Sequence, residues 1–526
     1  MAKVLISDKM NPLAAEIFAQ KGVDVDVKTG LTPDDLVKII GEYDGLAVRS
    51  STKVTPEILA AATKLKVIGR AGIGVDNIDV KAATEKGVVV MNTPFGNSIT
   101  TAEHAVAMMF SLARQIPQAN ESTHGGKWEK SKFMGVELTG KTVGVIGCGN
   151  IGAIVAARGI GLKMRVIAFD PFLTSERAKE MGIEKVELDA LYSRADFITI
   201  HVPKNEHTLH MINQETLAKM KDGVRIINCA RGGIIVEADL KLALESGKVA
   251  GAALDVFETE PATENVLFGM DNVICTPHLG ASTSEAQVNV AVQVAEQLSD
   301  FLVDGAVNNA LNMAPISAED APKLNPYLRL AEQMGSFAGQ ISEHAITKIE
   351  VEYQGMVSAL NTRPISDALF AAILKTFRDE INMVNVRSML KEMKISISEG
   401  TSDDCEEFLT AIELTIHTET NVRSITGTLF AGKDPRIVDI EGVPIEAALS
   451  DHMLFIRNDD VPGLIGGVGT VLADAGINIA DFRLGRKTDK AQALALISID
   501  GQLSDDVFKQ VSALSQVRLA KSLSFV

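Results

Sequence analysis

The first 98 residues alternate short apolar runs with stretches whose apolar side chains recur at helical spacing. The runs KVLISD, VDVDVKT, DGLAVRS, KVIGRAG and GVVVMN are strand candidates, and PLAAEIFAQKG, PDDLVKII and TPEILAAATK lie between them. Strands that alternate with helices in this way form a parallel sheet covered by helices. We therefore expect the chain to begin with an α/β lobe built on a doubly wound parallel sheet.

A second series of the same kind begins at Lys141 and is framed by two long helical stretches. KTVGVIG, RVIAF, DFITIHV, VRIINC, GAALDV and NVICT are its strand candidates, and the helical stretches cover residues 99–119 and 283–303. Because consecutive elements usually pack as neighbours, one long helix leads into a second lobe and the other leads back. This order predicts a second lobe inserted into the first, with a cleft between them.

The pattern is more mixed after residue 316. The junction NMAPISAEDAPKLNPY is followed by the strand candidates AITKIEVEYQG and LTIHTET and by the helix candidate SDALFAAILKTF. The last block, with HMLFIRNDDVPGLIGGVGTVLADAGINIADFRLG, predicts strand, loop, helix and strand. We predict four domains. The first lobe is discontinuous and covers residues 1–98 and 287–316, and the inserted lobe covers residues 99–286. An intervening α+β domain then covers residues 317–450, and a small C-terminal α+β domain covers residues 451–526.

Three spaced glycines stand at the start of the inserted lobe. Gly147, Gly149 and Gly152 join a strand candidate to a helical run, and Asp170 follows the next strand candidate. The first glycine permits a tight turn, the second lets a pyrophosphate approach the backbone, and the third lets helix and strand pack closely. An acid after the second strand binds ribose hydroxyls and repels a 2′-phosphate. The spacing predicts NAD rather than NADP; glycine turns in a structural βαβ unit are the alternative.

Polar residues follow the later strand candidates of the inserted lobe. Arg231 stands in the turn after VRIINC, Asp255 ends GAALDV with Glu260 beyond it, and His278 follows NVICT. Ligands of doubly wound sheets bind at the carboxyl ends of the strands. Oxidation of a secondary alcohol needs a base, a carboxylate that orients the base, and a cation that grips the substrate. We predict these roles for His278, Glu260 and Arg231, although each residue type alone is common at surfaces.

Basic residues and overall charge narrow the class of ligand. Arg49, Lys53 and Arg70 stand near strand ends of the first lobe and suit a substrate that carries a phosphate and a carboxylate; ordinary surface basic residues are the alternative. The chain has a formal net charge of -17, which disfavours nucleic acid and anionic membranes as partners. The 4 cysteines are scattered without metal-ligand spacing, and no signal-peptide pattern is present. These features predict a cytoplasmic protein without a metal.

The motifs CARGG, DVFETEP and TPHLGAST, together with GCGNIG, resemble those of the D-isomer-specific 2-hydroxyacid dehydrogenases. The resemblance implies an NAD-binding Rossmann lobe inserted in a flavodoxin-like substrate lobe. VRSSTKVT, GRAGIGVDNID, NTPFGNS and KWEKSKFMG extend it to the long members of the family, which carry an intervening domain and a C-terminal ACT domain. Such members oxidise 3-phospho-D-glycerate to 3-phosphohydroxypyruvate with NAD in the first step of L-serine biosynthesis, and the resemblance implies the same activity here.

The resemblance also implies roles for individual residues. Arg231, Glu260 and His278 are the expected catalytic trio. The expected NAD contacts are Gly147, Gly149, Asn150, Ile151, Gly152, Asp170, Cys229, Ala230, Arg231, Asp255, His278, Gly280 and Ala281. The expected substrate contacts are Arg49, Arg70, Gly72, Ile73, Gly74 and Asn97. The chain departs from some relatives at Ile73 and Val202, which stand in place of Thr, and at Lys130, which stands in place of Arg.

The segment RNDDVPGLIGGVGTVLADAGINIADF resembles the ACT pattern. It implies that Asn458, Asp460 and Asn478 bind L-serine as a feedback inhibitor between paired domains; a dimerisation module without ligand is the alternative. Family likeness further implies a homotetramer. Two other functions stay open: another D-2-hydroxyacid dehydrogenase, such as one that reduces 2-oxoglutarate, and a non-catalytic NAD-sensing interaction protein.

Overall fold

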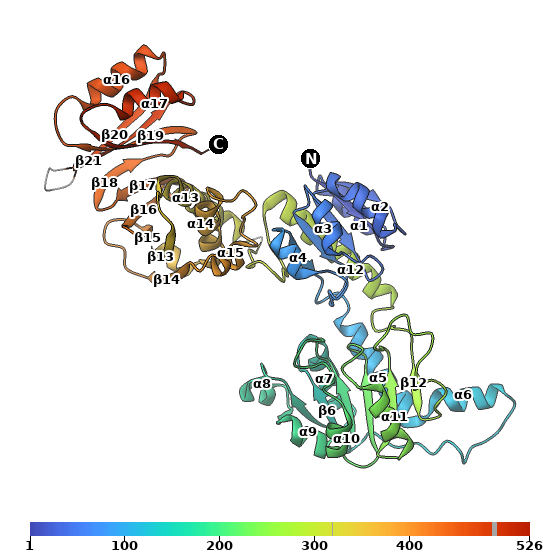
Figure 1. The fold of residues 1–526 in the computed structure, drawn as a ribbon. Coiled ribbons are helices and arrows are strands. Elements are labelled where there is room, and N and C mark those ends of the chain that lie inside the picture. The colour runs from blue at the N-terminus through green and yellow to red at the C-terminus, as the bar shows by residue number, and fades with distance from the viewer. Residues whose placement is uncertain (318, 487–491, 526) are drawn as a thin grey trace.

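A computed structural model describes residues 1–317, 319–486 and 492–525, which form four sheets in chain order (Figure 1). The first two sheets are connected by the helices α5 (Ser98–Arg114) and α12 (Ser284–Asp304), which run between the two lobes in Figure 1. The other two sheets follow toward the C-terminus. Among the described helices, none combines the length and the apolar character needed to cross a membrane.

The first sheet is parallel and has the order β2-β1-β3-β4-β5. This is a flavodoxin-like order, in agreement with the substrate lobe that the family resemblance implied. α1 and α12 cover one face, and α2, α3 and α4 cover the other. The bounds are β1 (Lys3–Ile6), α1 (Leu13–Gln20), β2 (Asp24–Val27), α2 (Pro33–Ile39), η1 (Ile40–Glu42), β3 (Gly45–Val48), α3 (Pro56–Ala61), β4 (Val67–Arg70), α4 (Val80–Glu85) and β5 (Val89–Asn92).

The second sheet is also parallel, with the order β12-β11-β10-β9-β6-β7-β8. The direction of winding reverses between β6 and β9, which is where doubly wound sheets bind dinucleotides. The bounds are α6 (Ile116–His124), β6 (Thr142–Ile146), α7 (Asn150–Gly161), β7 (Arg165–Phe169), α8 (Ser175–Glu180), β8 (Glu184–Lys185), α9 (Leu188–Arg194), β9 (Phe197–Ile200), α10 (Gln214–Lys219), β10 (Val224–Asn228), α11 (Glu237–Glu245), β11 (Val249–Leu254) and β12 (Val273–Cys275).

The third sheet is mixed and has the order β14-β13-β15-β16-β17-β18. The long helix α13 packs on its central strands and against α14. The bounds are α13 (Ala321–Ile341), β13 (Ile346–Gly355), η2 (Met356–Ala359), α14 (Arg363–Lys375), α15 (Val386–Glu392), β14 (Ser396–Ser402), β15 (Thr410–Thr418), β16 (Val422–Phe430), β17 (Asp434–Ile440) and β18 (Val443–Ala447).

The fourth sheet is antiparallel, with the order β20-β21-β19-β22, and two helices lie between its strands in the sequence. A β-α-β-β-α-β unit with this order is a ferredoxin-like fold. Its elements are β19 (His452–Asp459), α16 (Leu464–Asp474), β20 (Ile479–Arg486), β21 (Gln492–Ile499), α17 (Asp505–Ser512) and β22 (Val517–Ser524).

One continuous apolar core joins three of the four units. It includes Val4 in the first sheet, Val294 in α12, Leu330 in α13, Ile412 in the third sheet and Phe455 in the fourth. The second lobe has two cores of its own, one on each face of its sheet. The first lobe is therefore packed continuously with the C-terminal half, whereas the second lobe has a separate interior.

The structure corrects two details of the predicted elements. The stretch predicted as one helix over residues 99–119 is two helices, α5 and α6, which meet at Gln115 with a φ of 53°. In a continuous helix, the Pro117 ring would collide with the carbonyl of Ala113. That carbonyl instead accepts a hydrogen bond from the Val136 amide at 2.9 Å. The predicted junction before the third unit is wrong in its second half, where α13 already begins at Ala321.

Candidate active site

The glycine loop joins β6 to α7 with the geometry that its three glycines require. Gly147 has a φ of 88°, and a Cβ on it would lie 2.5 Å from the carbonyl oxygen of His201. A Cβ on Gly152 would lie 1.9 Å from the carbonyl oxygen of Gly147, so the helix packs directly on the loop. At Gly149 a Cβ would meet nothing within 4 Å. Protein atoms thus pack tightly against Gly147 and Gly152, whereas the space beside Gly149 is open and would admit a pyrophosphate.

Asp170 follows β7 and reaches back to the glycine loop. Its Oδ2 accepts a hydrogen bond from the Cys148 amide at 2.7 Å, and its Oδ1 accepts one from the Phe172 amide at 2.8 Å. Asn150 and Ile151 form the first turn of α7, where free amides and the helix dipole favour an anion. The structure therefore brings together the glycines, the first helical turn and the acid that the sequence predicted to hold NAD.

His278 and Glu260 form a hydrogen-bonded pair beyond the ends of β11 and β12. The distance between His278 Nδ1 and Glu260 Oε2 is 2.7 Å, and Glu260 Oε1 accepts a hydrogen bond from the Phe257 amide at 3.0 Å. Burial alone would raise the pKa of the Glu260 carboxyl. The hydrogen bonds from His278 and Phe257, together with the charges of His278 and Arg231, hold that pKa below its usual value. The ionised carboxylate accepts the Nδ1 proton and leaves Nε2 as the nitrogen available to a substrate.

Arg231 reaches from the second lobe to the first. Its Nε lies 2.9 Å from Asp76 Oδ2, in the loop after β4. The turn that carries Arg231 is held by Asn228, whose Oδ1 accepts from the Ala230 amide at 3.0 Å and whose Nδ2 donates to the Arg231 carbonyl at 2.9 Å. A Cβ on Gly74 would lie 1.6 Å from Arg231 Nη2, so the glycine makes room for the guanidinium.

Two further arginines stand in the first lobe near Arg231. Arg70 Nε donates to Asn77 Oδ1 at 3.0 Å, and Asn77 Nδ2 donates to the Arg49 carbonyl at 2.7 Å. The Arg49 amide donates to Asp8 Oδ2 at 2.6 Å. Burial, together with the positive charges of Arg231 and Arg49, lowers the pKa of Arg70 to about 10, against the opposing charges of Asp76 and Asp8. Clustered guanidiniums of this kind favour a ligand with more than one negative charge.

The other predicted substrate residues lie in loops at the same side of the first lobe. Asn92 Nδ2 donates to the Ile73 carbonyl at 2.6 Å, and the Gly72 carbonyl accepts from the Thr93 amide at 3.1 Å, so β5 supports the 72–74 loop. Asn97 is buried directly before α5, and its Oδ1 has no hydrogen-bond partner among the described residues. A hydrogen bond from a ligand would satisfy that buried oxygen.

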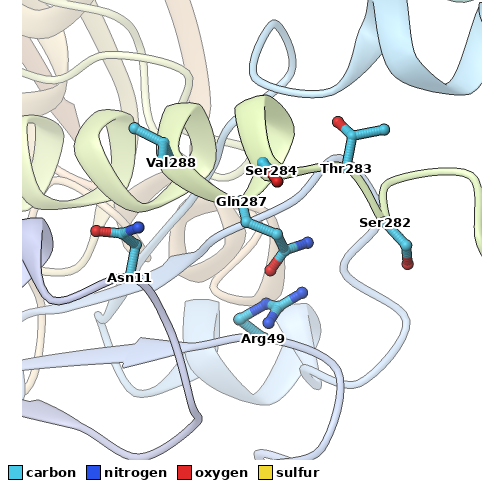
Figure 2. A pocket seen from close by; sticks show the side chains of 7 residues that line it. All are labelled: Asn11, Arg49, Ser282, Thr283, Ser284, Gln287 and Val288. Carbon is cyan, nitrogen blue, oxygen red and sulfur yellow. The ribbon is translucent and has the colours of Figure 1, made fainter.

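A pocket of about 620 Å³ opens between the first lobe and the start of α12 (Figure 2). Figure 2 shows the Gln287 amide and the Arg49 guanidinium turned toward each other from opposite walls. Gln287 Nε2 also donates to the Ala281 carbonyl at 2.9 Å, which links the pocket to the segment after His278. The other lining residues are Asn11, Ser282, Thr283, Ser284 and Val288.

The residues predicted to hold an effector lie in the fourth unit. Asn458 is buried at the end of β19, and its Oδ1 has no partner among the described residues. Asp460 Oδ1 lies 3.3 Å from Arg486 Nε, and Asn478 Nδ2 donates to Asp500 Oδ2 at 3.0 Å. Asn478 precedes β20 at the end of the sheet where β21 finishes, whereas Asn458 and Asp460 lie at the opposite end, so within one chain Asn478 stands apart from the other two.

Comparisons with known proteins agree with this arrangement. Residues 106–280 match the D-isomer specific 2-hydroxyacid dehydrogenase NAD binding domain, residues 323–441 the D-3-phosphoglycerate dehydrogenase intervening domain, and residues 452–514 the ACT domain. The D-3-phosphoglycerate dehydrogenase of Synechocystis sp. is 44% identical and covers 98% of this chain and 94% of its own length. That of Bacillus subtilis is 41% identical and covers 98% of each. The chain belongs to the D-3-phosphoglycerate dehydrogenase family.

Solved structures resemble the first two lobes. A glyoxylate reductase from Paecilomyes thermophila has a TM-score of 0.56 at 31% identity and covers 59% of this chain and 98% of its own. A D-lactate dehydrogenase from Aquifex aeolicus complexed with NAD and lactic acid has a TM-score of 0.53 at 28% identity, with coverage of 59% and 98%. The chain is therefore an NAD-dependent oxidoreductase, and the predicted fold class is confirmed. The roles of individual site residues stay predictions.

Sequence reasoning missed Asp76, Asn77 and Asn228, which support the arginines. Asp76 and Asn77 lie within GRAGIGVDNID, and Asn228 is the last residue of β10. The one available signal was position, because a polar side chain at the carboxyl end of a buried parallel strand points to a ligand or to the turn beyond it.

Gly74→Ala should lower kcat/KM by about 100-fold, because the added methyl group occupies the place of Arg231 Nη2 and shifts the guanidinium away from Asp76. The midpoint of thermal unfolding should change little, since a mobile side-chain end is displaced. Gly161→Ala is the matched control, because a Cβ there meets nothing within 4 Å. Unchanged kinetics in Gly74→Ala would mean that the position of Arg231 is unimportant.

Glu260→Gln should destabilise the chain at neutral pH but not in acid. The pKa of Glu260 in the folded chain is lowered from 4.5, so its ionised form stabilises the fold above about pH 4.5. That contribution is lost as the pH falls through the lowered folded pKa. Unfolding midpoints of the two proteins, measured from neutral pH downward, should therefore converge. A constant difference at every pH would contradict the assignment.

Proposed function

We propose that the chain catalyses the NAD-dependent oxidation of 3-phospho-D-glycerate to 3-phosphohydroxypyruvate, the first step of L-serine biosynthesis. The observation that carries the proposal is the His278–Glu260 pair together with the three guanidiniums of Arg231, Arg70 and Arg49. The names of the curated relatives agree with this substrate. A hydrogen-bonded base and several fixed cations suit an alcohol that also carries a carboxylate and a phosphate.

The second lobe supplies the NAD site. The open middle glycine and the first turn of α7 would hold the pyrophosphate, and Asp170 would hold the ribose of the adenosine half. The backbone of Cys229 and Ala230 and the segment 278–281 lie after β10 and β12, toward the expected nicotinamide end. The cofactor's nicotinamide accepts a hydride when NAD is bound.

His278 takes the proton of the substrate hydroxyl on Nε2. Glu260 keeps the Nδ1 proton in place and stabilises the positive charge that the ring then acquires. Arg231, close enough to act on the charge of Glu260, polarises the nascent carbonyl and grips the carboxylate. In the reverse direction His278 returns the proton to the oxygen.

Arg49 and Arg70 bind the remaining negative charge of the substrate. Arg70 is largely buried, and desolvation strengthens its attraction to an anion. A substrate with a phosphate offsets the mutual repulsion of the arginines, whereas a simple 2-hydroxy acid offsets less of it. This difference favours a phosphorylated substrate over the alternatives that the sequence left open.

Self-association and regulation by L-serine belong to the same proposal. The segment after α5 exposes Ile116, Trp128 and Met134, with Trp128 88% exposed, as apolar surface of a kind that subunit contacts cover. The polar groups of Asn458 and Asp460 in one ACT domain would meet Asn478 of a second copy and bind the ammonium, carboxylate and hydroxyl of L-serine. A homotetramer satisfies both contacts.

His278→Ala should abolish NADH formation from 3-phospho-D-glycerate while most of the NAD affinity persists, because the base and one predicted NAD contact are lost and the glycine loop is untouched. We expect a loss of at least about 1000-fold in kcat. His207→Ala is the control, since that side chain is 85% exposed and far from the Glu260 pair in the sequence. A panel of 2-hydroxy and 2-oxo acids, with and without phosphate, identifies the substrate by NADH absorbance. Preference for an unphosphorylated acid would refute the proposed substrate.

L-Serine at millimolar concentration should inhibit the enzyme, and Asp460→Ala should remove this inhibition without changing uninhibited turnover. The reason is that Asp460 would contact the amino acid but not the catalytic lobes. Asp506→Asn, at the exposed start of α17, is the matched acidic control. Full activity of the parent enzyme in serine would show that the ACT domain has another role.

A further inference from the structure

A fully buried carboxylate lies beneath the turn that carries His278. Asp255 Oδ1 accepts hydrogen bonds from Thr276 Oγ1 at 2.6 Å and from the Leu279 amide at 2.7 Å, and its Oδ2 accepts one from the Gly280 amide at 2.8 Å. Its backbone carbonyl accepts the His278 amide at 2.9 Å. One residue thus fixes the backbone on both sides of His278, which itself has a φ of 56°.

The connecting helix α5 contacts this turn from the other side. His104 Nε2 lies 3.3 Å from Asp255 Oδ1 and 3.3 Å from Thr276 Oγ1. Thr101 Oγ1 lies 2.9 Å from the Gly280 carbonyl oxygen, and both Thr101 and Gly280 are buried there. Two side chains of α5, those of Thr101 and His104, therefore contact the segment that carries the proposed base or the Asp255 carboxylate that supports it.

Both residues share a helix face with the predicted substrate contact Asn97. Positions 97, 101 and 104 follow the i, i+4, i+7 spacing of one helical face. The Thr101 amide and Oγ1 each lie 3.0 Å from the Asn97 carbonyl oxygen. Asn97 Oδ1 is buried and lacks a hydrogen-bond partner among the described residues. A ligand held by Asn97 is therefore linked through one turn of α5 to the His278 turn.

We propose that Thr101 and His104 are positioning residues that couple substrate binding at Asn97 to the placement of His278, Thr101 through the Gly280 carbonyl and His104 through the Asp255 carboxylate. The proposal rests on the proposed role of His278 as the base. It assigns to α5 a function beyond connecting the two lobes, because the same face of the helix touches both the substrate side and the base side of the site.

The same cluster contains donors that a metal ion uses, since one ligand atom each of His104, Cys229 and Asp255 lies within 4.8 Å of the others. Both carboxylate oxygens of Asp255 already accept hydrogen bonds. Burial, with the charge of Asp255, raises the pKa of the Cys229 thiol, whereas a metal requires the thiolate. Burial would also raise the pKa of Asp255, but the hydrogen bonds from His104, Thr276 and the Leu279 amide keep that pKa below its usual value. These bonds favour a positioning network over a metal site.

The test uses full-length enzyme with Thr101→Val, His104→Leu and His104→Gln. Thr101→Val keeps the shape and removes the hydroxyl, and His104→Gln keeps a side-chain donor that His104→Leu lacks. We expect kcat to fall by about 10- to 100-fold in Thr101→Val and His104→Leu, with the dissociation constant for NAD unchanged, because a misplaced base slows the chemical step. His104→Gln should recover part of the loss. Glu103→Gln, exposed on the same helix, should behave as the parent enzyme.

A double-mutant cycle shows whether the two residues act through His278. In a His278→Ala background, Thr101→Val should cause no further loss of residual turnover. Additive losses, or a weakened NAD affinity with an unchanged kcat, would overturn the proposal. Activity lost on EDTA dialysis and restored by Zn²⁺ would overturn it in favour of a metal site. Full activity of His278→Ala would refute the proposed role of His278 as the base. Loss of activity in His278→Ala, with full activity in Thr101→Val and His104→Leu, would refute only the positioning role of the two α5 residues. Should His104→Leu not fold, Thr101→Val carries the same test.

Discussion

In the proposed mechanism, the hydrogen bond between His278 Nδ1 and Glu260 determines which ring nitrogen meets a substrate, and the other proposed roles depend on that choice. Without the carboxylate the imidazole could rotate or change tautomer, and the hydroxyl of a substrate would have no fixed acceptor. The parallel sheet makes the pair possible because β11 and β12 end at the same edge, where their loops meet. The NAD site follows from the same geometry, since β6 and β7 end at that edge as well.

Three positively charged side chains, one from the second lobe and two from the first, stand close together in the proposed site. Arg231, Arg70 and Arg49 repel one another. Burial is the main cause of the lowered pKa of Arg70, and the positive charges of Arg231 and Arg49 add to it. Asp76 compensates only part of it, through its contact with Arg231. The proposed substrate, with its two separate anionic groups, would complete the balance, so a local cluster of cations is compatible with a chain whose net charge is -17.

The predictable parts of this protein are those whose signal is local. The strands of both lobes follow from apolar runs, and the glycine loop follows from the turn and packing demands of Gly147 and Gly152. Contacts made across long sequence separations could not be predicted: Asp76 and Arg231 are 155 residues apart. The break at Gln115 was missed because it depends both on Pro117 and on a distant contact. In that contact the Val136 amide donates a hydrogen bond to the Ala113 carbonyl. The start of α13 was missed because Pro322 and Pro326 suggested a loop. Pro322 lies in the first turn, where proline is compatible with a helix, and Pro326 lies inside the helix, which continues past it to Ile341.

The continuous apolar core has a mechanical consequence. Because the substrate lobe shares its interior with the two C-terminal units, those three parts resist bending relative to one another. The nucleotide lobe has its own interior and is connected to the substrate lobe through α5 and α12 and through polar contacts such as the one between Arg231 and Asp76. The wall of the site that carries Arg49 and Arg70 therefore shares its interior with the ACT domain, whereas the wall that carries the glycine loop does not.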